Sequence, residues 1–104
     1  MKNKKNISIK MWKVNGEFVL AACDSELLGK EFKEGELTLN VYESFYHERY
    51  VDKEEFISYL KSATIINLVG KRVINIAIEE GIVDKNNILY IKKIPHAQAV
   101  LMLK

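Results

Sequence analysis

The sequence predicts a small α+β fold in which about five strands form a mixed or antiparallel sheet packed against two main helices. Three observations indicate this class. Two alternating apolar stretches flank Asn15-Gly16, a helix-capping pattern begins at Asp52, and a periodic apolar stretch ends at Gly81. Strands grouped in hairpins beside separate helices are typical of α+β domains.

The N-terminal part of the chain predicts a β-hairpin. Residues 7–14 and 17–23 flank Asn15-Gly16, and these two residue types tolerate the positive φ angles of a two-residue hairpin turn. That turn fixes the register of the pair. The predicted partners are Val14 with Glu17, Met11 with Leu20, and Ile9 with Ala22. The side chains predicted to share one face are Ile9, Met11, Phe18, Leu20 and Ala22.

The next segment predicts a capped turn and a third strand. Asp24 is expected to cap a short helical turn, and Gly29 is expected to close it in the left-handed conformation. Residues 37–41 alternate apolar and polar side chains, which predicts a strand. Residues 43–51 are irregular and rich in aromatic side chains.

Two helices are predicted in the second half. Asp52 followed by Glu55 forms a capping-box pattern, which begins a helix of about ten residues. Residues 64–80 predict the second helix, which ends at Gly81. Its predicted core face consists of Ile66, Val69, Gly70, Val73, Ile74, Ala77 and Ile78. Its predicted solvated stripe consists of Asn67, Lys71, Asn75 and Glu79.

The two ends of the chain complete the predicted domain. Final strands are expected at 88–94 and 97–103, broken at Pro95-His96. Residues 1–6 are expected to form a flexible N-terminal tail, which leaves 7–104 as a single α+β domain.

Composition and motifs exclude several classes of protein. The net charge of +2 is too small to imply a nucleic-acid partner by itself, because dedicated binders gather many more uncompensated lysine and arginine side chains on one face; a modest basic surface remains open. The single cysteine, Cys23, excludes an internal disulfide. The longest apolar run, 18–23, is too short to span a membrane, and no signal peptide is readable. We therefore expect a cytoplasmic protein without a membrane partner.

Known cofactor and metal motifs are missing from the sequence. It contains no phosphate-binding or dinucleotide-binding glycine pattern and no metal-binding pair of cysteines or histidines. We expect no cofactor and no metal.

Two groups of residues remain as catalytic candidates. His96 and Gln98 are two residues apart and share one face of an extended segment, so they could bind a carbonyl or phosphate, or His96 could move protons. Alternatively, His96 satisfies backbone groups at a proline turn. Asp24 could help to form an anion site, although capping alone also explains it. Cys23 is a candidate nucleophile or a buried small apolar residue.

The aromatic loop supplies the binding candidates. Phe45, Tyr46 and Arg49 lie within nine residues that also contain Tyr42, His47 and Tyr50. Such groups stack on nucleic-acid bases or occupy protein interfaces, unless Phe45 and Tyr46 only anchor the loop to the core. Asn67 is a further binding candidate. It lies near Gly70, and a glycine inside a predicted helix suggests close packing of the backbone there.

A combined pattern extends over nearly the whole chain beyond the N-terminal tail. Its residues are Ala22-Cys23-Asp24, Leu28-Gly29-Lys30, Phe32, Glu34-Gly35, Phe45-Tyr46, Ala63-Thr64, Asn67, Gly70, Ala77, Gly81, Val83-Asp84 and Pro95-His96-Ala97-Gln98. By this pattern the chain resembles the archaeal family known as domain of unknown function 424. The resemblance implies an archaeal cytoplasmic protein of about this length and no particular activity.

Three functional hypotheses follow from the sequence. The first is a small non-enzymatic binding module, an accessory protein of RNA or ribonucleoprotein complexes, in which Phe45, Tyr46 and Arg49 contact the partner. The second is a small enzyme that uses His96 as acid or base, with Asp24, Gln98 and Asn67 arranging the substrate. The third is a subunit of a homo-oligomer that pairs through an apolar face of the final strand.

Overall fold

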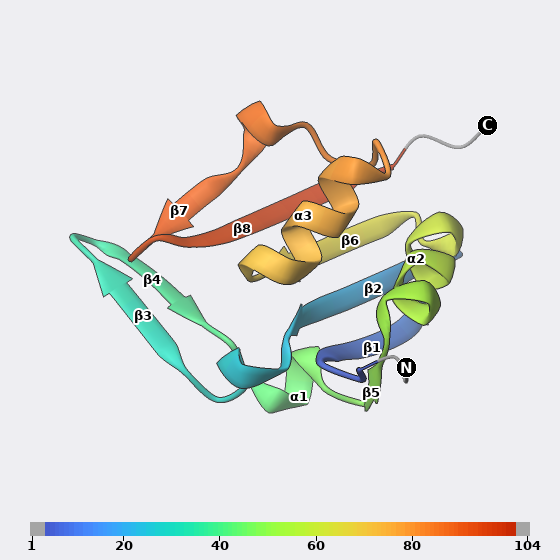
Figure 1. Cartoon of the computed structure of the whole chain (residues 1–104), viewed down its shortest axis with the longest axis horizontal. Helices are drawn as coiled ribbons and strands as arrows, with labels where there is room; N and C mark the ends of the chain where they lie inside the picture. Colours follow the sequence, from blue (N-terminus) through green and yellow to red (C-terminus); the bar gives the residue numbers. More distant parts are fainter. Residues whose placement is uncertain (1–3, 102–104) are drawn as a thin grey trace.

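A six-stranded sheet and a separate two-stranded hairpin form the frame of the protein (Figure 1). The computed structural model describes residues 4–101. The strands are β1 (Ile7–Val14), β2 (Glu17–Asp24), β3 (Glu31–Glu34), β4 (Leu37–Asn40), β5 (Arg49–Val51), β6 (Ile65–Val69), β7 (Leu89–Ile91) and β8 (Ile94–Val100). The helices are α1 (Glu43–Tyr46), α2 (Lys53–Ser62) and α3 (Lys71–Glu79), with 3₁₀ turns at Ser25–Leu27 and Lys85–Asn87. The prediction of an α+β fold is confirmed.

The large sheet has the order β5-β1-β2-β6-β8-β7. Only the β2–β6 pair is parallel, and every other pair is antiparallel. The connection between these parallel strands includes α2, since parallel neighbours need a long crossover. The sheet is therefore mixed, with β2 and β6 at its centre.

The predicted N-terminal hairpin is confirmed in its register. Val14 pairs with Glu17 across the turn, and Ile9 pairs with Ala22 near the other end. Asn15 and Gly16 have φ angles of 51° and 81°, as the turn requires. Ile9 and Leu20 are fully buried, whereas Phe18 is 41% exposed near the turn. The hairpin is thus anchored at its base and open at its tip.

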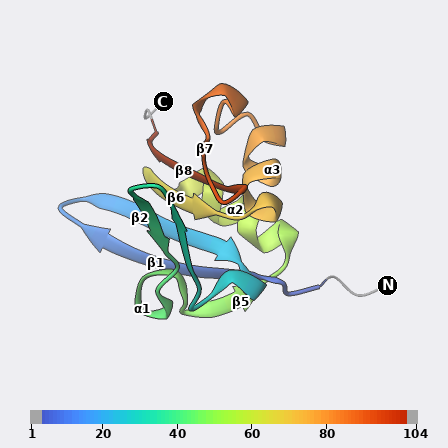
Figure 2. The same ribbon diagram turned by 90° about the vertical axis from the view of Figure 1, so that its left-hand side faces the viewer.

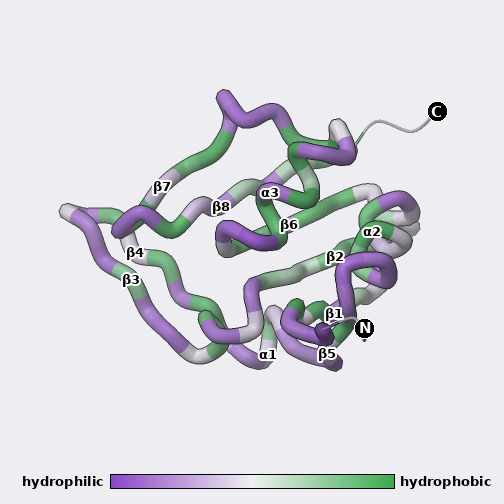
Figure 3. The backbone as a smooth tube through the Cα atoms, viewed as in Figure 1, coloured by the Kyte–Doolittle hydropathy of each residue, from purple (hydrophilic) through white to green (hydrophobic). Residues whose placement is uncertain are grey.

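Both faces of the large sheet carry a hydrophobic core. One core contains Ile9, Leu20 and Leu68 together with Phe56 of α2 and Val73 of α3, and Figure 2 shows both helices on that side of the sheet. The other core includes Ala21, Cys23, Val69, Leu39, Val41 and Tyr46, so α1 and the β3–β4 hairpin cover that face. Hydrophobic colour runs along β6 in Figure 3, because a central strand covered on both faces needs apolar residues in succession.

The predicted helix at 64–80 is wrong in its first part. Residues Ile65–Val69 form β6, and α3 begins only after Gly70. Gly70 has φ 117° and ψ 151°, which no helix contains. The sequence pattern misleads because β-branched residues continue from the strand into the helix, while pairing with β2 and β8 favours the strand. The helix at Lys53–Ser62 is confirmed, including the capping box between Asp52 and Glu55.

The third predicted strand forms β4, but in the second sheet rather than the large one. It pairs with β3, which the sequence analysis did not predict. The backbone N–H of Lys92, at the β7–β8 turn, donates to Oε1 of Glu34 at 2.6 Å. In Figure 1 the tip of the β3–β4 hairpin accordingly lies next to that turn. The short strand β5 was also missed, in a segment predicted to be irregular.

The break between the last two strands lies at Lys92-Lys93 and not at Pro95-His96. Both lysines have positive φ angles, 53° and 66°, and Ile91 pairs with Ile94 across them. Pro95 and His96 lie inside β8. The predicted strand end at 102–103, and residues 1–3 of the predicted tail, lie outside the described residues. Within the part that is described, Asn6 is held in place because its carbonyl accepts the backbone N–H of Ser25 at 3.0 Å.

Among residues 4–101, no helix has the length and apolar character needed to cross a membrane.

Candidate functional site

Three polar side chains predicted as site residues lie on one face of the large sheet. Asn67 of β6 pairs with Gln98 of β8, and Val69 pairs with His96. Because side chains alternate between the faces of a sheet, residues 67, 69, 96 and 98 share one face. This is the face of the second core, which contains Val69. The structure thus brings Asn67, His96 and Gln98 together.

The Asn67 amide is held by two hydrogen bonds. The hydroxyl of Tyr46 donates to Oδ1 at 2.5 Å, and Nε2 of His96 lies 3.2 Å from the same oxygen. An amide oxygen can only accept hydrogen bonds, so Nε2 of His96 carries the proton. Tyr46 is 4% exposed, and burial raises the pKa of its hydroxyl. Tyr46 therefore stays protonated and fixes the orientation of Asn67.

His96 is held in its neutral form by its surroundings. Burial lowers the pKa of its imidazole from the usual 6.5, because removal from water disfavours the charged ring. With the proton on Nε2, the other ring nitrogen, Nδ1, is an acceptor. A neutral His96 with its proton on Nε2 can donate a hydrogen bond to Oδ1 of Asn67 and so orient that amide.

An open pocket of about 360 Å³ lies on the same face of the sheet, where Asn67 pairs with Gln98. Asn67 and Gln98 line it together with apolar side chains. The complete lining is Val19, Phe45, Ile65, Ile66, Asn67, Gln98, Ala99 and Val100. Gln98 is exposed and Asn67 is half-buried, so two amides lie beside an apolar wall. Ligand pockets typically combine an apolar lining with a few placed polar groups.

Two residues that the sequence analysis did not select complete this region. The Trp12 ring packs edge-on against Phe45, with ring centroids 5.2 Å apart. Nζ of Lys10 lies 5.8 Å from the Trp12 ring centroid and donates to the carbonyl of Ser44 at 2.8 Å. The alternation in 7–14 was a usable signal, because it places Lys10 and Trp12 opposite Ile9 and Met11. We refer to Lys10, Trp12, Phe45, Asn67 and Gln98 as the amide–aromatic face.

Asp24 lies on the opposite side of the sheet from His96. Its carboxylate accepts the backbone N–H groups of Arg72 at 2.9 Å and Val73 at 3.0 Å. It does not cap the turn at Ser25–Leu27 with its side chain, which corrects the sequence prediction, because the first turn of α3 supplies better-placed donors. Asp24 and His96 are therefore not brought together.

Opposing effects act on the pKa of the Asp24 carboxyl. The side chain is 5% exposed, and burial raises the pKa of its carboxyl, against the hydrogen bonds from the two α3 N–H groups and the nearby Arg72. Its function is thus to close the N-terminus of a core helix.

Cys23 is fully buried next to Asp24. Burial first, and then the carboxylates of Asp24 and Glu26, raise the pKa of its thiol to about 12. A thiol with such a pKa is almost entirely protonated at neutral pH and is a poor nucleophile. The interpretation of Cys23 as a small buried residue is the one that this environment favours.

The predicted aromatic loop is divided by the structure. Phe45 is half-buried and Tyr46 is buried, both on the side of the second core. Arg49 of β5 pairs with Ile9 of β1. Its guanidinium lies 4.9 Å from the ring centroid of Tyr59 in α2. Arg49 therefore faces the helical side and does not join Phe45 and Tyr46.

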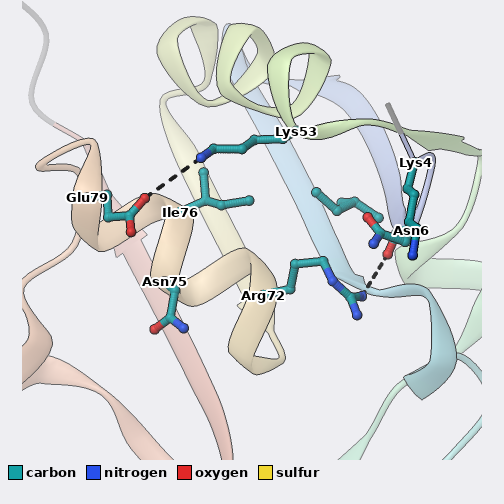
Figure 4. Close-up of a pocket in the computed structure, with 8 residues that line it drawn as sticks. Lys4, Asn6, Lys53, Arg72, Asn75, Ile76 and Glu79 are labelled. Carbon is teal, nitrogen blue, oxygen red and sulfur yellow. Dashed lines mark hydrogen bonds and ion pairs between the residues drawn. The ribbon is translucent and has the colours of Figure 1, made fainter. Parts of the chain in front are cut away.

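A second pocket, of about 400 Å³, opens on the helical side (Figure 4). Lys4, Lys53 and Arg72 contribute positive charge to it. Arg72 already donates to both carboxylate oxygens of Glu26, at 2.9 and 3.0 Å, and to the carbonyl of Asn6 at 2.9 Å. Nζ of Lys53 lies 3.9 Å from Glu79. Within residues 4–101, two of these three cations thus already face carboxylates, which leaves little charge for an anion.

No group of three or more histidine, cysteine, aspartate or glutamate side chains gathers into a metal-binding arrangement within residues 4–101.

The chain is similar to known proteins in its family and in its fold. The model of the family described as "Protein of unknown function (DUF424)" matches residues 12–102. The crystal structure of an uncharacterized conserved protein from Methanopyrus kandleri is similar, with a TM-score of 0.78 and 21% sequence identity. The similarity covers 94% of this chain and 95% of that one. No curated protein matches the chain.

Proposed function

This chain belongs to the DUF424 family, and we propose that it is a small non-enzymatic module that binds single-stranded RNA on its amide–aromatic face. The observation that carries the proposal is the pocket in which Asn67 and Gln98 lie beside Phe45. Amides and an aromatic ring on an accessible sheet face are the groups that bind unpaired bases.

The chemistry of single-stranded RNA supports this choice. Proteins bind such strands by stacking bases on aromatic rings and by hydrogen bonds to the exposed edges of the bases. Phe45 is half-buried in the pocket wall, with Trp12 against it. Lys10 supplies a positive charge beside Trp12 for a phosphate. The three kinds of contact that a nucleotide needs therefore occur within one surface.

The positions of the catalytic candidates favour a binding function over an enzyme. The Asp24 carboxylate already accepts hydrogen bonds from two backbone N–H groups of α3, and it lies on the other side of the sheet from His96. His96 directs its protonated nitrogen to Asn67. The thiol of Cys23 is held protonated by burial. Each of these three groups thus has a structural function in the fold.

Trp12 provides a direct test because it is the single tryptophan of the chain. The experiment titrates the protein with an eight-nucleotide single-stranded RNA and with a duplex of equal length, at low and moderate salt. We expect quenching of Trp12 fluorescence with the single strand, weaker binding at higher salt, and little quenching with the duplex. Labelled RNA followed by anisotropy gives an independent affinity. No binding of the single strand at low salt would overturn the proposal.

A further inference from the structure

We infer that Asn67 is a fixed hydrogen-bond donor that selects an unpaired base with a carbonyl group next to an N–H group, with uracil as the best fit. This inference rests on the proposed RNA-binding function and adds the class of base. It follows from which atoms of Asn67 are already occupied, and which remain free, at the wall of the pocket.

The acceptor side of Asn67 is already in use. Its Oδ1 receives the Tyr46 hydroxyl and the His96 Nε2–H, and a carbonyl oxygen has two lone pairs. Both donors are held by the fold, since Tyr46 is buried and His96 lies in β8. In this arrangement the amide oxygen of Asn67 faces Tyr46 and His96, and its NH₂ group faces away from them.

The donor side of Asn67 is therefore directed outward. Within residues 4–101, the Nδ2 group has no hydrogen-bond partner, yet no side-chain nitrogen or oxygen of this part of the chain is buried without one. Nδ2 consequently reaches solvent, and Asn67 lines the pocket. The pocket thus presents an N–H donor of fixed direction, which complements a carbonyl oxygen.

Gln98 supplies the second half of the recognition. It lies directly across from Asn67 on the neighbouring strand and is exposed, so its amide is free to present oxygen or nitrogen. Uracil has a carbonyl on each side of its N3–H, so in either orientation Asn67 donates to a carbonyl while Gln98 accepts the N–H. Adenine has no carbonyl on its Watson–Crick edge. It can pair with both amides in only one of the two orientations, in which its N1 accepts from Asn67 and its amino group donates to Gln98.

The walls of the pocket suit a flat, partly apolar ring. Phe45 stands on one side, and Val19, Ile65 and Val100 form the apolar outer end. Val100 is 73% exposed, so this end is open to a strand that continues beyond the pocket. A base inside an RNA chain can therefore enter without a free end.

The test exchanges the donor of Asn67 for an acceptor of the same shape. Asn67→Asp keeps an oxygen for Tyr46 and His96 but removes the NH₂ group. The same change at Asn75, which is exposed on α3, is the matched control for the added charge. The probes are eight-nucleotide oligomers of uridine and of adenosine, together with uridine monophosphate. Thermal unfolding confirms that both variants are folded.

We expect Asn67→Asp to weaken binding of the uridine oligomer at least about tenfold beyond the loss seen with Asn75→Asp, and to weaken the adenosine oligomer less. Comparing variant with wild type on each RNA removes the effect of adenosine self-stacking. Equal losses on both oligomers, or no loss, would overturn base selection by Asn67 while RNA binding itself remains. If neither oligomer binds the wild type, the proposed function fails as well. If uridine monophosphate bound as tightly as the oligomer, the ligand of the pocket would be a free nucleotide, and RNA would be refuted as that ligand.

Discussion

Gly70 and Asp24 approach each other so closely that no side chain fits between them. A Cβ atom built on Gly70 would lie 2.5 Å from Cγ of Asp24 and 2.7 Å from both of its carboxylate oxygens. This contact lets the Asp24 carboxylate reach the first N–H groups of α3. Asp24 at the end of β2 and Gly70 just before α3 are 46 residues apart in sequence, and the two elements are joined through this carboxylate and this glycine.

Gly70→Ala should strongly destabilise the protein. The new Cβ would collide with Asp24, and a φ of 117° is strained for any residue with a side chain. We expect a loss of more than about 2 kcal/mol in the free energy of unfolding, measured by urea denaturation. The matched control is Gly81→Ala, where φ is 74° and no atom lies within 4 Å, with an expected loss of about 1 kcal/mol. Equal losses would show that the contact with Asp24 is unimportant.

Asp24→Asn should change the pH dependence of stability. The folded carboxyl has a pKa raised above 3.8 by burial, so the folded protein keeps this proton to a higher pH than the unfolded chain does. The stability linked to Asp24 is thus fully present below pH 3.8 and is lost as the pH rises through the raised pKa. Asparagine cannot titrate and should remove this slope in urea denaturation. Asp84→Asn, at the exposed 3₁₀ turn, is the control, and parallel curves for wild type and Asp24→Asn would contradict the prediction.

His96 should show the opposite pH dependence. Its pKa is lowered from 6.5 by burial, so the unfolded chain takes up this proton first as the pH falls. The associated stability is complete above pH 6.5 and is lost as the pH falls toward the lower pKa of the folded state. His96→Gln should remove this loss. An NMR titration of the His96 ring gives the direct measurement, and a midpoint at or above 6.5 would refute the burial argument.

Lys10→Gln should reduce the salt dependence of RNA binding. If Lys10 contacts one phosphate, its loss should change the slope of log K against log salt by about 0.7 for a single strand. The control is Lys71→Gln, since Lys71 is exposed on α3 on the other side of the sheet. Anisotropy titrations at four salt concentrations measure both slopes. A change of slope for Lys71→Gln but not for Lys10→Gln would move the electrostatic contact to the helical face.

Phe45→Ala should weaken RNA binding through the loss of a stacking surface. A stacked base contributes about 1–3 kcal/mol, which corresponds to a loss in affinity of roughly fivefold to 150-fold. Tyr90→Ala removes another ring, 57% exposed on the edge strand β7, and should leave affinity unchanged. Circular dichroism establishes that both variants are folded. An affinity loss with Tyr90→Ala alone would place the binding surface at the β7 edge.

The sequence predicted parts of the candidate site but not how they meet. His96 and Gln98 were selected together, since two residues of one extended segment share a face whatever the strand order is. Asn67 was selected on a helix, whereas it lies on a strand beside Gln98. The bond from Tyr46 to Asn67 joins residues 21 apart in sequence, and no local pattern contains that information.

The sequence by itself determined the local elements: the hairpin at Asn15-Gly16 with its register, and the helix capped by Asp52. Both depend on turn and cap chemistry within a few residues. Only the tertiary structure decided that 65–69 is a strand, that Asp24 caps a distant helix, and that Asn67 lies between Tyr46 and His96. These outcomes depend on which strands pair and which faces are covered, and the free energy of those contacts exceeds the weak local preference of a β-branched segment.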